Sequence, residues 1–397
     1  MPGNTLRTEI KHPVTSLLVK VHSRCNLMCD YCYEYNSGNT AWRSKPKEMS
    51  ALVYEKMLER VQEHCLAHEV KDYFFSFHGG EPLLRNADWY RYAVVRAKEI
   101  LEPYTHISFG TQSNGTLLTE EWVSLLSELS ISYGISLDGP RAVHDKFRVH
   151  SNGDPSFEET LQGCQHLLTP TGRQIWGGIL SVMDVTSDPI EVFDFLASLN
   201  PPTIDFLEPH ATWDKMPPGK KAHSETIYGD WLVRLFDYWF DNNIGRIPIR
   251  KFDEIIEHLC GGEGMVESFG LEPVTLVTVA TDGMIETVDC MKAAKSDAHY
   301  LGLSVFENSF DEVLMHPLVH ERQTGLRALP EKCQNCDLVL TCGGGYFPHR
   351  YDSKDDSYKH PTAYCADYQV LISYIKDKVE RAIGKSLSNS TIAGSAP

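Results

Sequence analysis

The stretch Cys25-Asn-Leu-Met-Cys29-Asp-Tyr-Cys32 places three cysteines within eight residues, in a C-x3-C-x2-C pattern. Three thiolates this close on one loop can hold three corners of a cubane iron–sulfur cluster. No fourth cysteine follows nearby, so the fourth iron would keep an open position, as catalytic metal sites do. The alternatives are a zinc knuckle completed by His22 or an unrelated group of thiols.

Short β-type runs recur along the first half of the chain, and the cysteine stretch follows the first of them. We expect strands over 15–21, 72–78, 107–111, 133–136, 175–182 and 204–208. Helical or mixed segments separate them, which indicates a parallel α/β barrel rather than an antiparallel sheet. The first helix is expected over 50–67, with an apolar face made by Leu52, Met57, Leu58 and Val61.

Polar motifs follow three of these strands, at the end where barrel enzymes collect functional groups. Gly79-Gly80-Glu81-Pro82 comes directly after the second strand, where glycines let the backbone approach a ligand and Glu81 can accept from an ammonium group. Asn114 ends the third strand, and Ser136 and Asp138 end the fourth. The alternative in each case is turn chemistry alone.

Together these motifs resemble the radical S-adenosylmethionine (radical SAM) enzymes, whose core is typically an open six-stranded (β/α)6 barrel. The resemblance implies that Cys25, Cys29 and Cys32 hold a [4Fe-4S] cluster that cleaves S-adenosylmethionine to a 5′-deoxyadenosyl radical. The run His144-Asp-Lys-Phe-Arg148 continues the pattern of sulfatase-maturating and related peptide-modifying enzymes.

The same resemblance implies a set of S-adenosylmethionine contacts. Gly79, Gly80 and Glu81 would contact the methionine amino group, and Arg148 would contact the carboxylate. Asn114 and Ser136 would contact the polar edges of the molecule, and Tyr31 and Leu207 the adenine region.

A second cysteine group, Cys333-x2-Cys336-x5-Cys342 followed by Cys365, lies in the C-terminal part of the chain. Four thiolates can close a cluster completely, and a structural zinc ribbon is the alternative. The group resembles SPASM, an auxiliary-cluster domain of radical SAM enzymes that modify ribosomal peptides. The resemblance implies one auxiliary [4Fe-4S] cluster on these four residues.

The chain departs from the SPASM pattern at the inner cluster. Tyr346 stands where the pattern has a further cysteine, and the inner cluster keeps at most Cys260 and Cys290 as ligands. We therefore expect the inner cluster to be incomplete.

The sequences 282–289 and 342–351 resemble a SPASM subgroup whose best-described members make cyclophanes. Those enzymes join an aromatic side chain to the β-carbon of a nearby residue in a precursor peptide. Sulfatase maturases have an aspartate base directly after the cysteine that matches Cys290. Met291 occupies that position here, which tells against formylglycine formation.

Cross-link formation also needs a group that takes up a proton, and Asp289, beside Cys290, is the candidate base. Asp282 and Glu286 serve equally well on sequence grounds. A peptide epimerase and a thioether synthase are the alternative enzymes. A non-catalytic iron–sulfur redox or binding protein is the alternative of another class.

The composition limits the partners of this 397-residue chain. A net charge of −17 argues against a nucleic-acid backbone as partner. The sequence has no membrane-spanning apolar stretch and no signal-peptide core, so we expect no membrane association and a cytoplasmic location. The expected partners are a precursor peptide and an external electron donor of the flavodoxin or ferredoxin type.

The expected organisation has five parts, and the early start of the barrel predicts no fused N-terminal leader-binding domain. The parts are an N-terminal extension (1–14), the radical SAM core (15–215), a helical bridge (216–259), a SPASM-like domain with a C-terminal helix (260–383) and a disordered tail (384–397).

Overall fold

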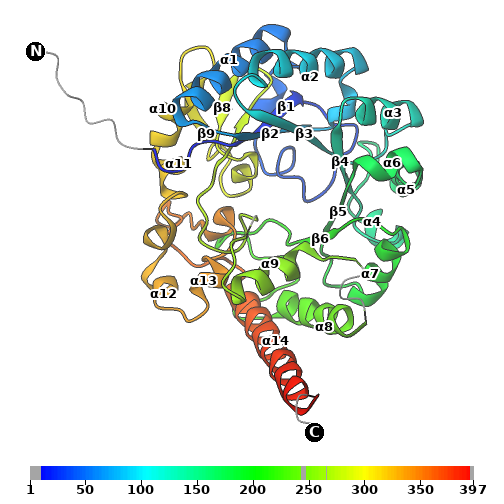
Figure 1. The fold of residues 1–397 in the computed structure, drawn as a ribbon, viewed down its shortest axis with the longest axis vertical. Helices are drawn as coiled ribbons and strands as arrows, with labels where there is room; N and C mark the ends of the chain where they lie inside the picture. Colours follow the sequence, from blue (N-terminus) through cyan, green and yellow to red (C-terminus); the bar gives the residue numbers. More distant parts are fainter. Residues whose placement is uncertain (1–9, 243–246, 265, 394–397) are drawn as a thin grey trace, which may run out of the picture.

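The computed structural model of the chain describes residues 10–242, 247–264 and 266–393 (Figure 1). Its first six strands pair side by side in sequence order, and every pair is parallel. The strands are β1 (Ser16–His22), β2 (Asp72–Gly79), β3 (His106–Ser113), β4 (Ile131–Ser136), β5 (Trp176–Val182) and β6 (Ile204–Leu207). The predicted six-stranded parallel architecture is confirmed.

Helices cover the outside of this curved sheet. In Figure 1 the strands run from the top of the molecule down its right-hand side, with the early helices outside them. The helices that precede β7 are α1 (Ala51–His68), α2 (Ala87–Leu101), α3 (Glu120–Glu128), α4 (Arg141–His144), α5 (Phe157–Leu167), α6 (Pro170–Ile175), α7 (Pro189–Ser198), α8 (Ile227–Asn242) and α9 (Arg250–Leu259). Two short 3-10 helices, η1 (Ala41–Arg43) and η2 (Pro82–Leu84), lie in the same part of the chain.

The two faces of the strands differ in character because successive side chains point to opposite sides. Phe77 of β2 lies on the outer face, where its ring contacts Trp89 and Tyr90 of α2 at centroid distances of 5.7 and 5.4 Å. His78, the next residue, therefore lies on the inner face, in register with Lys20 of β1. The outer face is hydrophobic core, and the inner face carries polar groups.

The C-terminal part of the chain continues the same sheet. β7 (Leu276–Val279) pairs parallel with β1, and β8 (Met284–Glu286) and β9 (Tyr300–Ser304) follow antiparallel. The sheet therefore has nine strands in the order β6-β5-β4-β3-β2-β1-β7-β8-β9. η3 (Asp289–Ala293) follows β8, and its Asp289 contacts Lys20 of β1 and Tyr33, which follows the cysteine stretch.

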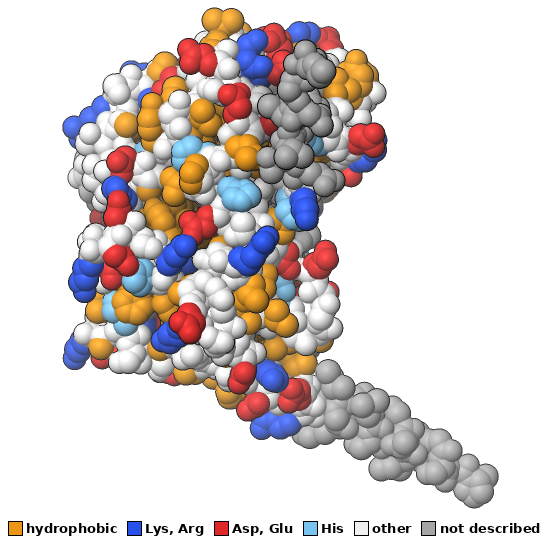
Figure 2. Space-filling model, turned by 90° about the vertical axis from the view of Figure 1, so that its left-hand side faces the viewer, with side chains coloured by type: hydrophobic (Ala, Val, Ile, Leu, Met, Phe, Trp, Pro, Cys, Tyr) orange, Lys and Arg blue, Asp and Glu red, His pale blue; other side chains and the backbone are white. Residues whose placement is uncertain are grey.

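The remaining elements are short, except for the last helix. They are α10 (Phe310–Met315), α11 (Pro317–Glu321), η4 (Gly325–Ala328), α12 (Glu331–Gln334), α13 (Val339–Cys342), η5 (Phe347–Arg350) and α14 (Cys365–Ala393). No helix among the described residues is long and apolar enough to cross a membrane. Acidic and basic side chains are interspersed on the face shown in Figure 2, as on a solvated surface.

Two local expectations differ from the structure. Met57, Leu58 and Val61 of α1 are buried as expected, but Leu52 is 70% exposed, and Val53 and Tyr54 are buried instead. α14 runs to Ala393, so most of the segment 384–397 that we expected to be disordered is helical, and the last four residues lie outside the described part of the chain. No proline interrupts this helix after its packed first turns, so it propagates beyond them.

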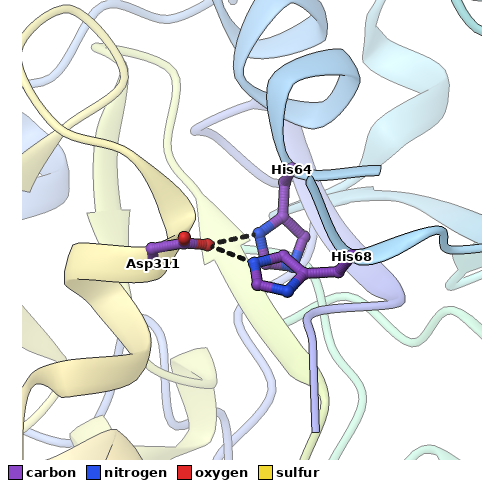
Figure 3. A group of neighbouring side chains, drawn as sticks. All are labelled: His64, His68 and Asp311. Carbon is purple, nitrogen blue, oxygen red and sulfur yellow. Dashed lines mark hydrogen bonds and ion pairs between the residues drawn. The ribbon is translucent and has the colours of Figure 1, made fainter. Parts of the chain in front are cut away.

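A polar contact between α1 and α10 joins the barrel to the C-terminal part (Figure 3). Asp311 Oδ1 lies 2.9 Å from His64 Nδ1 and 2.8 Å from His68 Nε2. His64 Nε2 accepts the backbone N–H of Val14 at 2.9 Å, so the neutral His64 ring carries its proton on Nδ1 and donates it to Asp311. The three groups are close enough for a metal ion, but metal at Nδ1 would move that proton to Nε2, against the Val14 N–H. The arrangement therefore favours a hydrogen-bonded link.

The link predicts a pH dependence of stability. Burial lowers the pKa of His64 to about 4, below the value near 6.5 of an unfolded histidine. The unfolded chain then binds more protons between these values, so the free energy of unfolding should fall by up to about 3 kcal/mol as the pH drops from about 6.5 to about 4. Thermal unfolding across this range should show a shallower decline in His64→Gln than in the wild type. His106→Gln, at an exposed position, is the control, and an unchanged pH profile in His64→Gln would contradict the assignment.

Candidate active site

The cysteine loop that follows β1 presents three thiols close to polar donors. Cys25 Sγ accepts the backbone N–H of Leu27 at 3.4 Å and lies 3.7 Å from Asn114 Nδ2. Donors of this kind tune iron–sulfur clusters when they reach cysteine sulfur. Burial raises the pKa of Cys29 to about 11 and raises that of Cys25 further. These groups would become thiolates when a metal replaces their protons, so the donor set fits a cluster.

The glycines of the Gly79-Gly80-Glu81 motif are required by the cysteine loop itself. A side chain on Gly79 would collide with the His22 carbonyl, and one on Gly80 with the Tyr35 hydroxyl. Backbone bonds from Gly80 N to His22 O (2.9 Å) and from Glu81 N to Arg24 O (3.0 Å) hold the two segments together. The glycines therefore let the end of β2 and the start of the cysteine loop lie against each other.

Glu81 is fully buried and organises the neighbouring strand ends. Its Oε1 accepts the Leu83 N–H at 2.9 Å and the Ser113 hydroxyl at 2.8 Å, and Oε2 accepts the Asn114 N–H at 2.9 Å. Burial nevertheless raises the pKa of Glu81 to about 7. These bonds use three of the four acceptor positions of the carboxylate, which leaves one on Oε2 for a further donor.

Asp138 orients two of the predicted ligand contacts. Its Oδ2 accepts the Tyr31 hydroxyl and Arg148 Nε, the latter at 3.0 Å, and its Oδ1 accepts the Val182 N–H at 3.0 Å. The Arg148 guanidinium lies 5.4 Å from the centre of the Tyr31 ring. The bond to Asp138 uses Nε and leaves the two terminal nitrogens of Arg148 available for another carboxylate.

The other predicted contacts also lie at the carboxyl ends of the strands. Asn114 Nδ2 donates to Asn26 of the cysteine loop at 2.9 Å, and Ser136 Oγ accepts Gln112 Nε2 at 2.9 Å. Leu207 is the last residue of β6, farther round the sheet. The fold thus brings Glu81, Asn114 and the Asp138 group to the strand ends beside the cysteine loop. For Asp138, turn chemistry was the alternative left open by the sequence, but the partners of its side chain come from other elements.

The second cysteine group is also assembled. Cys333 of α12, Cys336, Cys342 of α13 and Cys365 of α14 line one pocket, together with Tyr368. Burial and the neighbouring thiols raise the pKa of Cys342 to about 12. Four thiols that line one pocket, one buried and three half-buried, fit the ligand set of a closed cluster.

The residues expected near an inner cluster are arranged differently. Cys290 is buried and its Sγ contacts the Tyr346 hydroxyl, at the position where the SPASM pattern has a cysteine. The Tyr346 ring stacks on His210 at 6.1 Å. Cys260 is exposed at the end of α9. The described contacts of Cys290 are therefore with an aromatic cluster.

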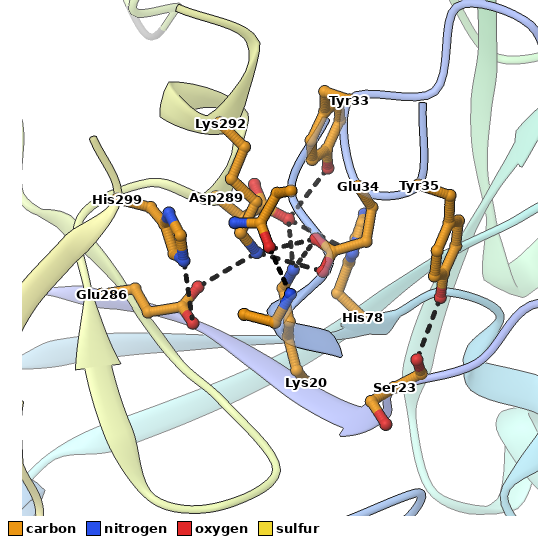
Figure 4. Close-up of polar contacts among 12 residues, drawn as sticks. Lys20, Ser23, Tyr33, Glu34, Tyr35, His78, Glu286, Asp289, Lys292 and His299 are labelled. Carbon is orange, nitrogen blue, oxygen red and sulfur yellow. Dashed lines mark hydrogen bonds and ion pairs between the residues drawn. The ribbon is translucent and has the colours of Figure 1, made fainter. Parts of the chain in front are cut away.

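Asp289, the candidate base, belongs to a buried charge network (Figure 4). Its Oδ2 accepts the Tyr33 hydroxyl at 2.9 Å and lies 3.3 Å from Lys20 Nζ. Lys20 also pairs with Glu34, which pairs in turn with Lys292 at 2.8 Å. Burial opposes ionisation of Asp289, but Lys20 and its other neighbours hold its pKa well below the usual range. Asp289 is therefore ionised and already paired with a positive charge, so it is a weak base.

The two other candidate bases lie at the far side of the network. Glu286 is buried and pairs with Lys45 at 2.7 Å and with Lys292 at 3.3 Å. Asp282 pairs with Lys45 at 3.3 Å. Sequence reasoning missed Lys20, which pairs with Asp289 and Glu34, although a lysine within an apolar strand was a usable signal.

Comparison with known proteins finds relatives over most of the chain. The model of the radical SAM superfamily matches residues 19–191. A serine-type anaerobic sulfatase-maturating enzyme of Bacteroides thetaiotaomicron is 25% identical over 385 residues, which cover 91% of this chain and 89% of that one. A protein of Methanocaldococcus jannaschii is 31% identical over 235 residues, which cover 59% of this chain and 72% of that one.

Two solved structures share the fold. Native anSMEcpe with bound AdoMet matches with a TM-score of 0.79 at 23% identity, over 93% of this chain and 99% of that one. Streptococcus suis SuiB bound to the precursor peptide SuiA matches with a TM-score of 0.58 at 15% identity, over 89% of this chain and 76% of that one. With its cysteine loop, its strand-end motifs and these matches, the chain belongs to the radical SAM superfamily.

Proposed function

We propose that the protein is a radical SAM enzyme that oxidises a ribosomally made peptide and joins an aromatic carbon to the Cβ of a nearby residue, a cyclophane-type cross-link. The observation that carries this proposal is the presence of two thiol sets, one of three cysteines and one of four. A set of three leaves an iron open to a ligand, whereas a set of four closes a cluster. A reaction that starts with a radical and ends with loss of an electron needs a cluster with an open iron to form the radical and a closed cluster to accept the electron.

The residues have separate tasks in this proposal. Cys25, Cys29 and Cys32 would hold the first [4Fe-4S] cluster, which with S-adenosylmethionine supplies a 5′-deoxyadenosyl radical. Arg148, oriented by Asp138, would bind the carboxylate of S-adenosylmethionine, with Glu81, Asn114, Ser136, Tyr31 and Leu207 completing the contacts. The four-thiol pocket would hold the auxiliary [4Fe-4S] cluster.

A peptide is the substrate class that the comparisons favour. Two of the similar proteins are named for the maturation of sulfatases, in serine-type and cysteine-type forms. One similar structure holds a Cp18Cys peptide beside AdoMet, and SuiB holds a precursor peptide. An external donor of the flavodoxin or ferredoxin type would supply the first electron.

Oxidation of a serine or cysteine to an aldehyde is the second candidate, because of the similarity to maturases over most of the chain. Met291 favours the cross-link, because its thioether cannot act as the base that maturases carry at this position. The contacts of Cys290 with Tyr346 also depart from the SPASM pattern.

The first prediction concerns iron. Anaerobically reconstituted protein should hold about eight irons, four for each cysteine-ligated cubane. The double variant Cys333→Ala/Cys336→Ala should hold about four, whereas Cys260→Ala, at an exposed site, should keep about eight. Iron and sulfide analysis gives these numbers, and a wild-type value near twelve would show that Cys290 and its neighbours hold a third cluster.

The second prediction concerns S-adenosylmethionine binding. Glu81→Gln removes the negative charge that would pair with the methionine ammonium group of S-adenosylmethionine. Loss of charge-assisted bonds of this kind costs about 1.5–3 kcal/mol, roughly a ten- to hundredfold loss of affinity. Equilibrium dialysis should show this loss at unchanged iron content. Glu120→Gln, at an exposed site in α3, should bind normally, and equal affinity in both variants would refute the role of Glu81.

The third prediction concerns the product. Incubation with the peptide encoded beside the gene should remove two hydrogens from it, without creating a group that reacts with hydrazide. Mass-spectrometric fragmentation of the product peptide should give no fragments from cleavage between the joined residues. Cys333→Ala/Cys336→Ala should still make 5′-deoxyadenosine but no cross-linked peptide. A hydrazide-reactive product would show that the enzyme forms an aldehyde and not the cross-link.

A further inference from the structure

His78 faces the charged groups of the network in Figure 4 and lies on the inner face of the sheet, in register with Lys20. It directly precedes Gly79-Gly80-Glu81. About a fifth (21%) of its side chain is exposed, whereas Asp289 is only 5% exposed. A substrate group on the inner face of the sheet can therefore reach His78 but not Asp289.

The two nitrogens of His78 have different surroundings. Nδ1 is buried, has no hydrogen-bond partner among the described residues and lies 3.9 Å from Asp289 Oδ2. The negative charge of Asp289 favours the proton on this nitrogen. The exposed edge of the ring then presents the lone pair of Nε2. Such contacts are often long in a ligand-free enzyme and shorten in the complex.

Three charged groups face the ring, each from a different element. They are Lys20 of β1, Glu34 of the cysteine loop and Asp289 of η3. Burial lowers the pKa of His78, Asp289 and Glu34 oppose this effect, and Lys20 adds to it. His78 is accordingly neutral near pH 7, the state that a base needs.

We propose that His78 accepts, on Nε2, the proton that leaves the substrate, and that Asp289 is a positioning residue that holds Nδ1–H and stabilises the imidazolium. This inference rests on the proposed function. It reassigns the base from Asp289 to His78. The pairing follows the logic of carboxylate–histidine pairs, in which the carboxylate sets the tautomer and stays ionised.

The proton leaves the substrate after the carbon–carbon bond of the cross-link has formed. The 5′-deoxyadenosyl radical takes a hydrogen atom from Cβ, and the Cβ radical forms a carbon–carbon bond to the arene. The C–H bond at the attacked arene carbon then breaks. Its proton goes to His78 Nε2, and one electron goes to an oxidised iron–sulfur acceptor. The peptide has then lost two hydrogens.

Other buried histidines do not offer the same arrangement. His299 faces Glu286 at 3.8 Å but is only 5% exposed. His210 is hydrogen-bonded to His349 at 3.2 Å and stacked on Tyr346. His299 is therefore a matched control, since it belongs to the same network and burial lowers its pKa to about 4.

The test compares His78→Gln with His299→Gln, both loaded with clusters, S-adenosylmethionine and the peptide encoded beside the gene. The measured quantity is the ratio of cross-linked peptide to 5′-deoxyadenosine. Hydrogen abstraction precedes proton transfer, so His78→Gln should form 5′-deoxyadenosine but lower the ratio about a hundredfold or more. His299→Gln should keep the wild-type ratio. Below the ordinary histidine range of pH, the wild-type ratio should fall, and this fall should be absent from His78→Gln.

Chemical rescue separates a proton acceptor from a structural residue. Imidazole added to His78→Ala should restore part of the cross-linking, and the same addition to Asp289→Asn should not. A wild-type ratio in His78→Gln would overturn the assignment of His78 while leaving the proposed function intact. Wild-type protein that removes no hydrogens from the peptide would overturn the proposed function, and the inference with it.

Discussion

The parallel pairing of β7 with β1 is the constraint on which the candidate site depends. β1 lies between β2 and β7, with Ser16–Val19 in register with both neighbours. The cysteine loop leaves the end of β1, so residues from the first and last thirds of the chain meet there. Lys20 then bridges Glu34 and Asp289 in the interior. Loss of this lysine would leave the buried Asp289 without its lysine partner, which is strongly destabilising.

This arrangement separates the tasks of the molecule. The ends of β2, β3 and β4 form a polar rim around the cysteine loop, with the buried carboxylates of Glu81 and Asp138 fixing its shape. The charge network lies beside that rim, and the four-thiol pocket belongs to the C-terminal elements. Met291 follows Cys290, and His78, which we propose as the base, lies on β2 of the same sheet.

The sequence predicted the local features of this fold well. All six barrel strands lie within two residues of their predicted bounds, because period-two burial is visible in a single strand. The cysteine groups were predictable for a similar reason, since their spacing is local. The continuation of the sheet through β7–β9, the role of Asp138 and the meeting of Lys20, His78 and Asp289 depend on which strands are neighbours. Local patterns carry no information about that choice, so these features required the structure.

The production of 5′-deoxyadenosine tests the central claim most directly. Reduced protein with reconstituted clusters should convert S-adenosylmethionine to 5′-deoxyadenosine and methionine, as quantified by chromatography and mass spectrometry. The variant Cys25→Ala/Cys29→Ala/Cys32→Ala should form none, while its four-thiol site still binds iron. Absence of 5′-deoxyadenosine from the wild type, or equal amounts from both proteins, would contradict the assignment of a radical SAM enzyme.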